Sequence, residues 1–209
     1  FSSWGTHRLT LGALAGALAA AALVYLISMA QGEMTPLRLV LSGVVLSSAF
    51  SALASFLVFR SPDPRAAQSV LFWMLGSVAG ATWDSLWVAA LVTVVIAVLM
   101  IAFSGWLDAL AAGTDVARSL GIPDTRVRKA LFIGNSVLVG VLVAVSGGIG
   151  FVGLVIPHMA RLLVGASHRS MLPIAAAVGS LFLLWVDVGA RVIAAPQEVP
   201  LGVVTGFIG

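Results

Sequence analysis

The sequence predicts an all-α membrane protein, a polytopic helical bundle. Hydrophobic residues make up 60% of the 209 residues and charged residues only 9%, which is too apolar for a soluble domain of this length. The charge-free residues 9–30, 39–59 and 85–107 each reach the roughly 20 residues that a helix needs to cross the hydrocarbon core. The alternation typical of a membrane barrel is absent, so helices must satisfy the backbone.

The first predicted helix, residues 9–30, carries Gly12 and Gly16. Small residues at this spacing usually allow a close approach of two helices inside a bundle. The loop of residues 31–36 is short, so the second helix is expected to lie antiparallel beside the first.

The second predicted helix, residues 39–59, is unusual for its hydroxyl groups. Three of them repeat every four residues and form one stripe, with a fourth beside it: Ser47, Ser51, Ser55 and Ser48. Two interpretations stay open. The hydroxyls can bond a neighbouring helix or the preceding turn, or they can face a water-filled pathway through the membrane.

A break follows at residues 61–65, Ser-Pro-Asp-Pro-Arg. Residues 66–80 are too short to span a membrane and are expected to lie at its interface or to re-enter the protein. Trp83 and Trp87 then stand where an aromatic belt would anchor the third span, which is expected to end near Trp106.

Residues 108–129 form a polar segment between apolar runs. Four of the eleven Lys and Arg residues are clustered in it: Arg118, Arg126, Arg128 and Lys129. Since short loops rich in Lys and Arg stay in the cytoplasm, this segment is predicted to lie on the cytoplasmic side. If the helices alternate, three further cations join it, Arg38, Arg161 and Arg169, against four outside, Arg8, Arg60, Arg65 and Arg191.

The polar segment also carries the signals of folded helices. Thr114 can cap a helix and Asp115 complements its dipole. Gly121 can take the left-handed position after the last turn, and Pro123 prevents continuation. A second short helix is expected from residue 124, capped by the Asp-Thr pair there. Two capped helices predict a knob that docks against a partner.

Residues 130–157 are too long for one span, and four glycines are expected to break them: Gly147, Gly148, Gly150 and Gly153. A shorter helix, residues 151–164, would then return, kinked at Pro157. The glycines match a dinucleotide-binding fingerprint only formally, because no βαβ unit and no acidic residue about 20 positions on accompany them.

His158 follows Pro157 and could hold a proton or a metal ion, but no second ligand is near, which favours a packing or capping role. Residues 170–194 contain Asp187 and Arg191, four apart on a helix. Pairing across one turn lowers the cost of placing both charges at membrane depth. A structural lock near the outer end is therefore expected, followed by an outer turn and a last helix from Leu201.

The chain starts without Met and stops within an apolar helix, so we expect one transmembrane domain, residues 1–209, truncated at both ends. It has no cysteine, which excludes disulfides and thiolate metal sites. The scattered cations form no patch for nucleic acid.

Several motifs together resemble the permease subunits of ATP-binding-cassette importers for iron–siderophore, haem and cobalamin. The most specific is the block at residues 146–161, SGGIGFVGLVIPHMAR, followed by SHR at 167–169 and LP at 172–173. The structural signature that the resemblance implies comprises Gly148, Gly150, Gly153, Pro157, His158, Arg161, Asp187 and Arg191. Further matches are LSGV at 41–44, FWMLGS at 72–77, ARSLGI at 117–122, DVGAR at 187–191 and EVPLGVVT at 198–205.

The resemblance implies a ten-helix subunit of the bacterial inner (plasma) membrane, of which this chain holds about seven helices, four to ten. Two copies, or a pseudo-dimer, would surround a central pathway, and the serine stripe would line this pathway and its cytoplasmic gate. Residues 108–129 would be coupling helices in a cleft of the ATPase subunit, and a periplasmic or lipoprotein substrate-binding protein would dock on the outer loops. The residues implied in coupling are Thr114, Asp115, Arg118, Leu120, Gly121, Ile122 and Pro123.

No phosphate-binding loop is present, and Lys129 is the only lysine. Uphill transport would therefore need ATP and magnesium on a partner subunit, while this chain would bind no cofactor or metal and would not act as an enzyme. The sequence does not choose between a siderophore, haem and cobalamin as the cargo.

Two other functions stay open. An ion-coupled secondary transporter would place ionisable residues at mid-membrane, and only Asp187 and Arg191 are candidates. An intramembrane serine protease could use Ser136 with His158 or His168, although a serine in a helix more often bonds locally.

Overall fold

The computed structural model describes residues 3–30, 36–193 and 199–208. No strand occurs in these three stretches. The helices are α1 (Ser3–Ala30), α2 (Pro36–Phe59), α3 (Pro64–Met74), α4 (Trp83–Ala102), α5 (Ser104–Ala112), α6 (Thr114–Ser119), α7 (Asp124–Ser146), α8 (Val152–Val164), α9 (His168–Ile193) and α10 (Leu201–Ile208).

Four of these helices are long and apolar enough to cross a membrane: α2, α4, α7 and α9. The described part of α1 and the whole of α8 are shorter apolar helices, and α3 spans 11 residues only. The predicted all-α membrane architecture is therefore confirmed, and helices α1 and α2 lie where residues 9–30 and 39–59 predicted them.

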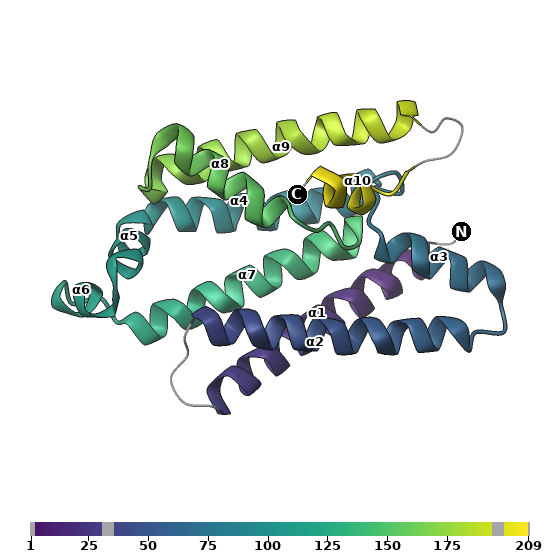
Figure 1. Cartoon of the computed structure of the whole chain (residues 1–209), viewed down its shortest axis with the longest axis horizontal. Coiled ribbons are helices and arrows are strands. Elements are labelled where there is room, and N and C mark those ends of the chain that lie inside the picture. Colours follow the sequence, from purple (N-terminus) through teal and green to yellow (C-terminus); the bar gives the residue numbers. More distant parts are fainter. Residues whose placement is uncertain (1–2, 31–35, 194–198, 209) are drawn as a thin grey trace.

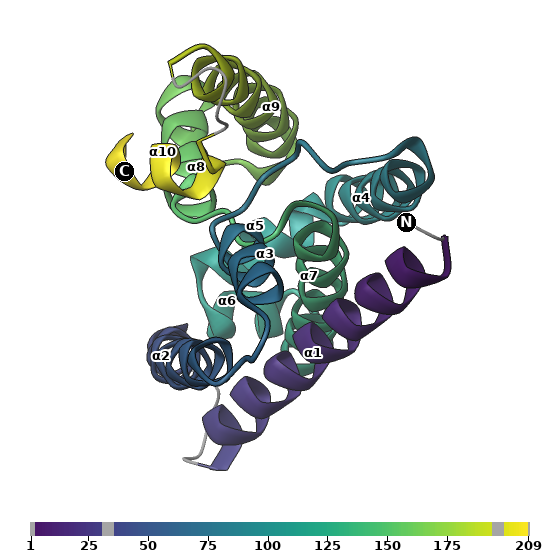
Figure 2. The same cartoon turned by 90° about the vertical axis from the view of Figure 1, so that its right-hand side faces the viewer.

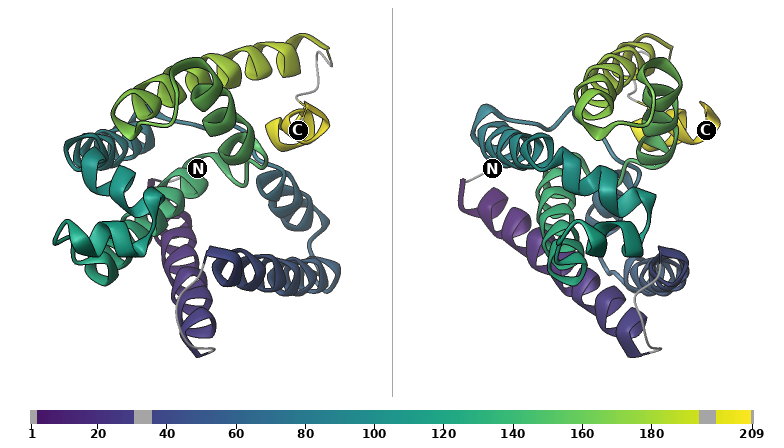
Figure 3. Two further views of the ribbon diagram at one scale, coloured as in Figure 1. Left: turned by 60° about the vertical axis from the view of Figure 1, so that its left-hand side comes forward. Right: turned by 90° about the vertical axis from the view of Figure 1, so that its left-hand side faces the viewer.

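The long helices run between two ends of the molecule (Figure 1). One end carries α5 and α6 and the starts of α2, α7 and α9. The opposite end carries α3, α10 and the turn between α7 and α8. Seen along the bundle, α1 crosses it obliquely, packed on α7 (Figures 2 and 3).

The cations follow this division. The end with α5 and α6 also holds the helix ends that carry Arg38, Arg161 and Arg169, so all seven cations predicted for the inner side gather there. The other four belong to helix ends on the opposite side. The grouping expected from the sequence is confirmed; which end faces the cytoplasm stays a prediction.

Two boundaries differ from expectation. The third span ends at Ala102 rather than near Trp106, because Phe103 leaves the helical conformation (φ −99°, ψ 20°) just before Ser104 and Gly105, a pair that often bends helices. The second short helix expected from residue 124 is the first part of α7, since nothing stops that helix before Gly147. The two short helices of the knob are therefore α5 and α6.

The prediction that Gly12 and Gly16 mediate close packing is wrong for the part of the chain that the structure describes. An added Cβ at either glycine would have no atom within 4 Å. The packed face of α1 carries Leu14 and Ala17, which lie against Gly140 of α7. Because residues two apart on a helix point to opposite sides, the contact at Leu14 leaves Gly12 and Gly16 uncovered.

Candidate functional site: the knob and its supports

The knob, defined here as residues 104–123, has a small core of its own. Ala109 of α5, Ala117 of α6 and Ile122 are buried, and Leu110 and Val127 pack against them. The core joins α5, α6 and the first turn of α7. A solvated loop would show no such core, so the knob is a folded unit with a fixed shape.

The turn after α6 confirms the predicted stop signal. Gly121 has φ +73°, a conformation that favours glycine. Its N–H donates to the carbonyl of Arg118 at 2.9 Å, and the N–H of Ile122 donates to the carbonyl of Ala117 at 3.0 Å. Together with the contact between Ile122 and Ala117, these bonds form a Schellman motif.

The predicted cap at Thr114 is wrong. Gly113 is the N-cap of α6, and no side chain bonds there. The chain turns sharply between α5 and α6 with φ +126° at residue 113, which glycine adopts and threonine does not. Thr114 becomes the first helical residue, and Asp115 lies in the first turn as expected. The Asp-Thr pair at 124–125 likewise forms no cap, because Pro123 precedes α7.

Arg118 pairs with Asp124 across this turn. The Nη2 atom lies 3.2 Å from Oδ2, and Nε lies 3.4 Å from Oδ1. The arginine side chain is 61% exposed, so solvent screens the ion pair and its contribution to stability is small. The pair also holds the end of α6 against the start of α7.

The predicted coupling residues divide into two groups. Leu120, which directly follows α6, is exposed. Val116 on α6 exposes a second apolar side chain, although the sequence did not single it out. Ile122 instead lies in the core. The knob therefore offers apolar contact surface at Val116 and Leu120, while Ile122 and Gly121 maintain its shape.

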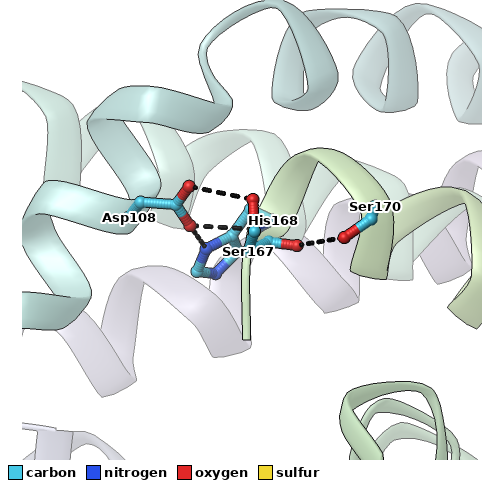
Figure 4. A network of polar contacts seen from close by, with 4 residues as sticks. All are labelled: Asp108, Ser167, His168 and Ser170. Carbon is cyan, nitrogen blue, oxygen red and sulfur yellow. Dashed lines mark hydrogen bonds and ion pairs between the residues drawn. The ribbon is translucent and has the colours of Figure 1, made fainter. Parts of the chain in front are cut away.

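A polar network between α5 and α9 was not expected from the sequence (Figure 4). Oδ1 of Asp108 accepts the backbone N–H of His168 at 2.9 Å and lies 2.5 Å from Nδ1 of the same residue. Oδ2 accepts the hydroxyl of Ser167 at 3.4 Å. The hydrogen bonds from the backbone and ring of His168 lower the pKa of Asp108, so its side chain is a carboxylate at neutral pH.

The serine stripe lies exposed along α2. Within the described chain only Ser48 of the four uses its hydroxyl, donating to the carbonyl of Val44 at 3.0 Å. Among the described residues, a hydroxyl contact between α1 and α2 is made by Ser28, which is fully buried and whose Oγ lies 3.4 Å from the Oγ of Ser42. Local bonding is thus confirmed for Ser48, and a pathway lined by the stripe stays a prediction.

The opposite end is organised by glycine backbones. The N–H groups of Leu201 and Gly202 donate to the carbonyls of Gly76 and Leu75, both at 2.9 Å, so the start of α10 is capped by the residues that follow α3. The N–H of Ser77 donates to the carbonyl of Ser146 at 2.8 Å. We call the region where the residues after α3, the end of α7 and the start of α10 meet the glycine junction. Its glycines are Gly76, Gly147, Gly148 and Gly202.

The glycine junction brings together three motifs that are distant in sequence. Gly147 ends α7, and Phe151 precedes α8 with φ +65°, so the predicted break in residues 130–157 is confirmed. Of the predicted signature glycines, Gly148 lies inside the junction, whereas Gly150 and Gly153 have open space beside them. Helices flank the turn on both sides, which agrees with rejecting the dinucleotide fingerprint.

The remaining signature residues lie on α8 and α9. Pro157 is inside α8, and His158 and Arg161 are exposed. The described residues contain no group of three metal-ligand side chains. Nε of Arg191 lies 2.9 Å from Oδ2 of Asp187, which confirms the predicted pair. Glu198 and most of the turn around it lie outside the described residues.

Neither alternative function gains support from the geometry. The hydroxyl of Ser136 donates to the carbonyl of Phe132 at 2.7 Å, and the ring of His168 is bonded to Asp108 instead. A serine protease nucleophile would need its hydroxyl hydrogen-bonded to a histidine. Asp187 and Arg191 pair with each other, which leaves no isolated charge there for a coupling ion.

Comparisons with known proteins agree with this architecture. The sequence matches the FecCD transport family over residues 1–209. It is 37% identical over its whole length to the iron(3+)-hydroxamate import system permease protein FhuG of Bacillus subtilis, covering 61% of that protein. It is 38% identical over 94% of the chain to the cobalamin import system permease protein BtuC of Halobacterium salinarum, covering 52%.

A solved metal-chelate type ABC transporter in an inward-facing conformation matches with a TM-score of 0.84 and 34% identity, over 98% of this chain and 68% of that one. The chain therefore spans between about half and two thirds of the proteins that it resembles.

Proposed function

Because the chain belongs to the FecCD transport family, we propose that the whole protein is the permease subunit of an ATP-binding-cassette importer in a bacterial inner (plasma) membrane. The observation that carries this proposal is the knob: a folded unit with exposed Val116 and Leu120 at the cation-rich end of a helical bundle. These 209 residues contain no phosphate-binding loop, so they need such a contact to receive work from an ATPase.

In this proposal residues 1–209 form one transmembrane domain, and residues 108–129 are its coupling segment. The ATPase subunits bind ATP and magnesium, and this chain binds no cofactor and performs no covalent chemistry. When nucleotide closes the ATPase pair, the knobs shift. The helices attached to them tilt, which opens the pathway to one side of the membrane at a time.

The remaining partners follow from the same proposal. Two permease copies enclose a pathway lined by the serine stripe, and a periplasmic or lipoprotein substrate-binding protein docks at the end that carries α3. Relatives are named for import of iron(3+)-hydroxamate and cobalamin and for transport of hemin. The proposed cargo is accordingly a bulky metal chelate, either a siderophore complex, haem or cobalamin.

The test is reconstitution of the full-length protein with its ATPase and substrate-binding protein in liposomes. We expect uptake of the cargo that requires ATP and stops when the ATPase carries a variant unable to hydrolyse it. Uptake driven by an ion gradient without ATP would overturn the proposal in favour of a secondary transporter. Mass spectrometry of ligands that copurify with the complex would identify the cargo to use.

A further inference from the structure

We propose that Asp108 and His168 form a latch that ties the knob to the start of α9, so that α9 moves with the knob during transport. Both are positioning residues, and the inference rests on the proposed coupling function. Asp108 stands on α5, sixty residues before His168 in the sequence, and Figure 4 shows its carboxylate turned toward the start of α9.

The chemistry of the contact is that of a helix cap supplied by another helix. The first N–H groups of a helix have no partner within it. Asp108 accepts one of them, the N–H of His168, and its negative charge also complements the dipole of α9. The ring Nδ1–H and the Ser167 hydroxyl bring a second and a third donor to the same carboxylate.

The latch is more directional than an apolar contact. Two oxygens receive three donors, and the His168 side chain is only 19% exposed. Hydrogen bonds weaken steeply when their angle or length changes. Sliding α5 past α9 would therefore break several bonds at once, whereas moving the two helices together breaks none of them.

The knob is also joined to the bundle by the chain at its two ends, and these two connections restrict its motion less than the latch does. It is joined to α4 through the bend at Phe103, and to α7 through the turn at residues 120–123. The latch adds a third attachment. Since α9 has 26 residues and extends about 39 Å, a displacement at His168 reaches the far end, where α9 packs on α10.

The test compares substitutions at the latch in the full-length transporter with its ATPase, and measures cargo moved per ATP hydrolysed. Asp108→Ala removes every acceptor and should lower this ratio about fivefold or more. His168→Asn can place an amide N–H near the position of Nδ1 and should stay within about twofold of wild type, whereas His168→Gln cannot and should fall between the two. Ser170→Ala is the matched control, because its hydroxyl bonds Ser167 rather than Asp108.

A distance measurement tests the motion itself. Spin labels can be attached to cysteines introduced at the exposed positions Ala111 on α5 and Ala176 on α9. The 209 residues contain no cysteine, and any cysteine elsewhere in the complex is replaced first. We expect the same narrow distance distribution without nucleotide and with trapped ATP, and a broadened one in Asp108→Ala. If that variant does not assemble, Asp108→Asn, which keeps one acceptor oxygen, takes its place and should broaden the distribution less.

The outcomes separate the latch from the proposed function. If the wild-type distance changes with nucleotide, or if Asp108→Ala keeps the full transport ratio, the latch is wrong. If substitutions in the knob such as Gly121→Val uncouple transport while Asp108→Ala does not, the latch fails and the proposed function stands. If no substitution in the knob affects coupling, the proposed function fails first and the latch falls with it.

Discussion

The knob and the glycine junction, at opposite ends of the bundle, are held together in different ways. Side chains hold the knob: a small apolar core, the Arg118–Asp124 pair and the carboxylate of Asp108. Backbone groups hold the junction, where carbonyls and N–H groups of three segments meet at glycines. The knob can therefore be altered one interaction at a time, whereas the junction leaves no room for a Cβ at Gly76, Gly147 or Gly202.

The largest effect is expected at the junction. A Cβ on Gly147 would lie 2.1 Å from the carbonyl oxygen of Trp73, and the residue has φ +68°. Since the obstacle is backbone, it cannot turn aside, and Gly147→Ala should cost roughly 3 kcal/mol or more of folding free energy. Thermal unfolding of the full-length protein in detergent measures this cost.

Gly80→Ala is the control for that substitution. Gly80 is exposed in the loop after the junction, has open space around it and needs no left-handed backbone. Its variant should unfold at the wild-type temperature. Equal unfolding temperatures for the variants at 147 and 80 would show that the junction is looser than its geometry indicates.

At the knob, Gly121→Val should leave the bundle intact but distort the Schellman turn. No atom lies within 4 Å of an added Cβ, so the cost comes from φ +73° alone, about 1–2 kcal/mol. We expect ATP hydrolysis to continue while transport falls about fivefold or more. Gly121→Asn is the matched control, because asparagine tolerates this conformation, and it should retain most of the coupling.

A charge reversal distinguishes two roles of Arg118. Arg118→Glu breaks the pair with Asp124 and should lower coupling with little change in stability, because the arginine side chain is mostly exposed to solvent. The double variant Arg118→Glu/Asp124→Arg restores an ion pair of reversed polarity. Recovery of transport per ATP in the double variant would assign the pair to the shape of the knob; no recovery would indicate that a partner reads the charge of Arg118.

The sequence predicted the features that depend on neighbouring residues. Hydropathy located the long helices, and Gly121 followed by Pro123 identified the Schellman turn, because those signals act over a few positions. The i,i+4 pair of Asp187 and Arg191 was predictable for the same reason. The permease motifs added the family, which local chemistry alone would not have supplied.

Features that depend on packing were missed. Thr114 has the right chemistry for a cap, yet the tight turn from α5 to α6 gives that place to Gly113. The contact between Asp108 and His168 joins residues sixty apart, and no local pattern pairs them. Gly12 and Gly16 have a packing motif, but the face of α1 that meets α7 is set by Leu14 and Ala17.

The smallest effect on stability is expected along the serine stripe, whose residues belong neither to the core of the knob nor to the junction. Ser51 is exposed on α2 and forms no hydrogen bond within the described residues, so Ser51→Ala should change the free energy of unfolding by less than about 0.5 kcal/mol. Ser51→Leu should be equally stable, but it replaces a small hydroxyl side chain with a larger apolar one. If the stripe lines the pathway, the leucine variant transports more slowly while its ATPase stays bound and active. Equal transport by both variants would place this face of α2 against lipid or another helix instead.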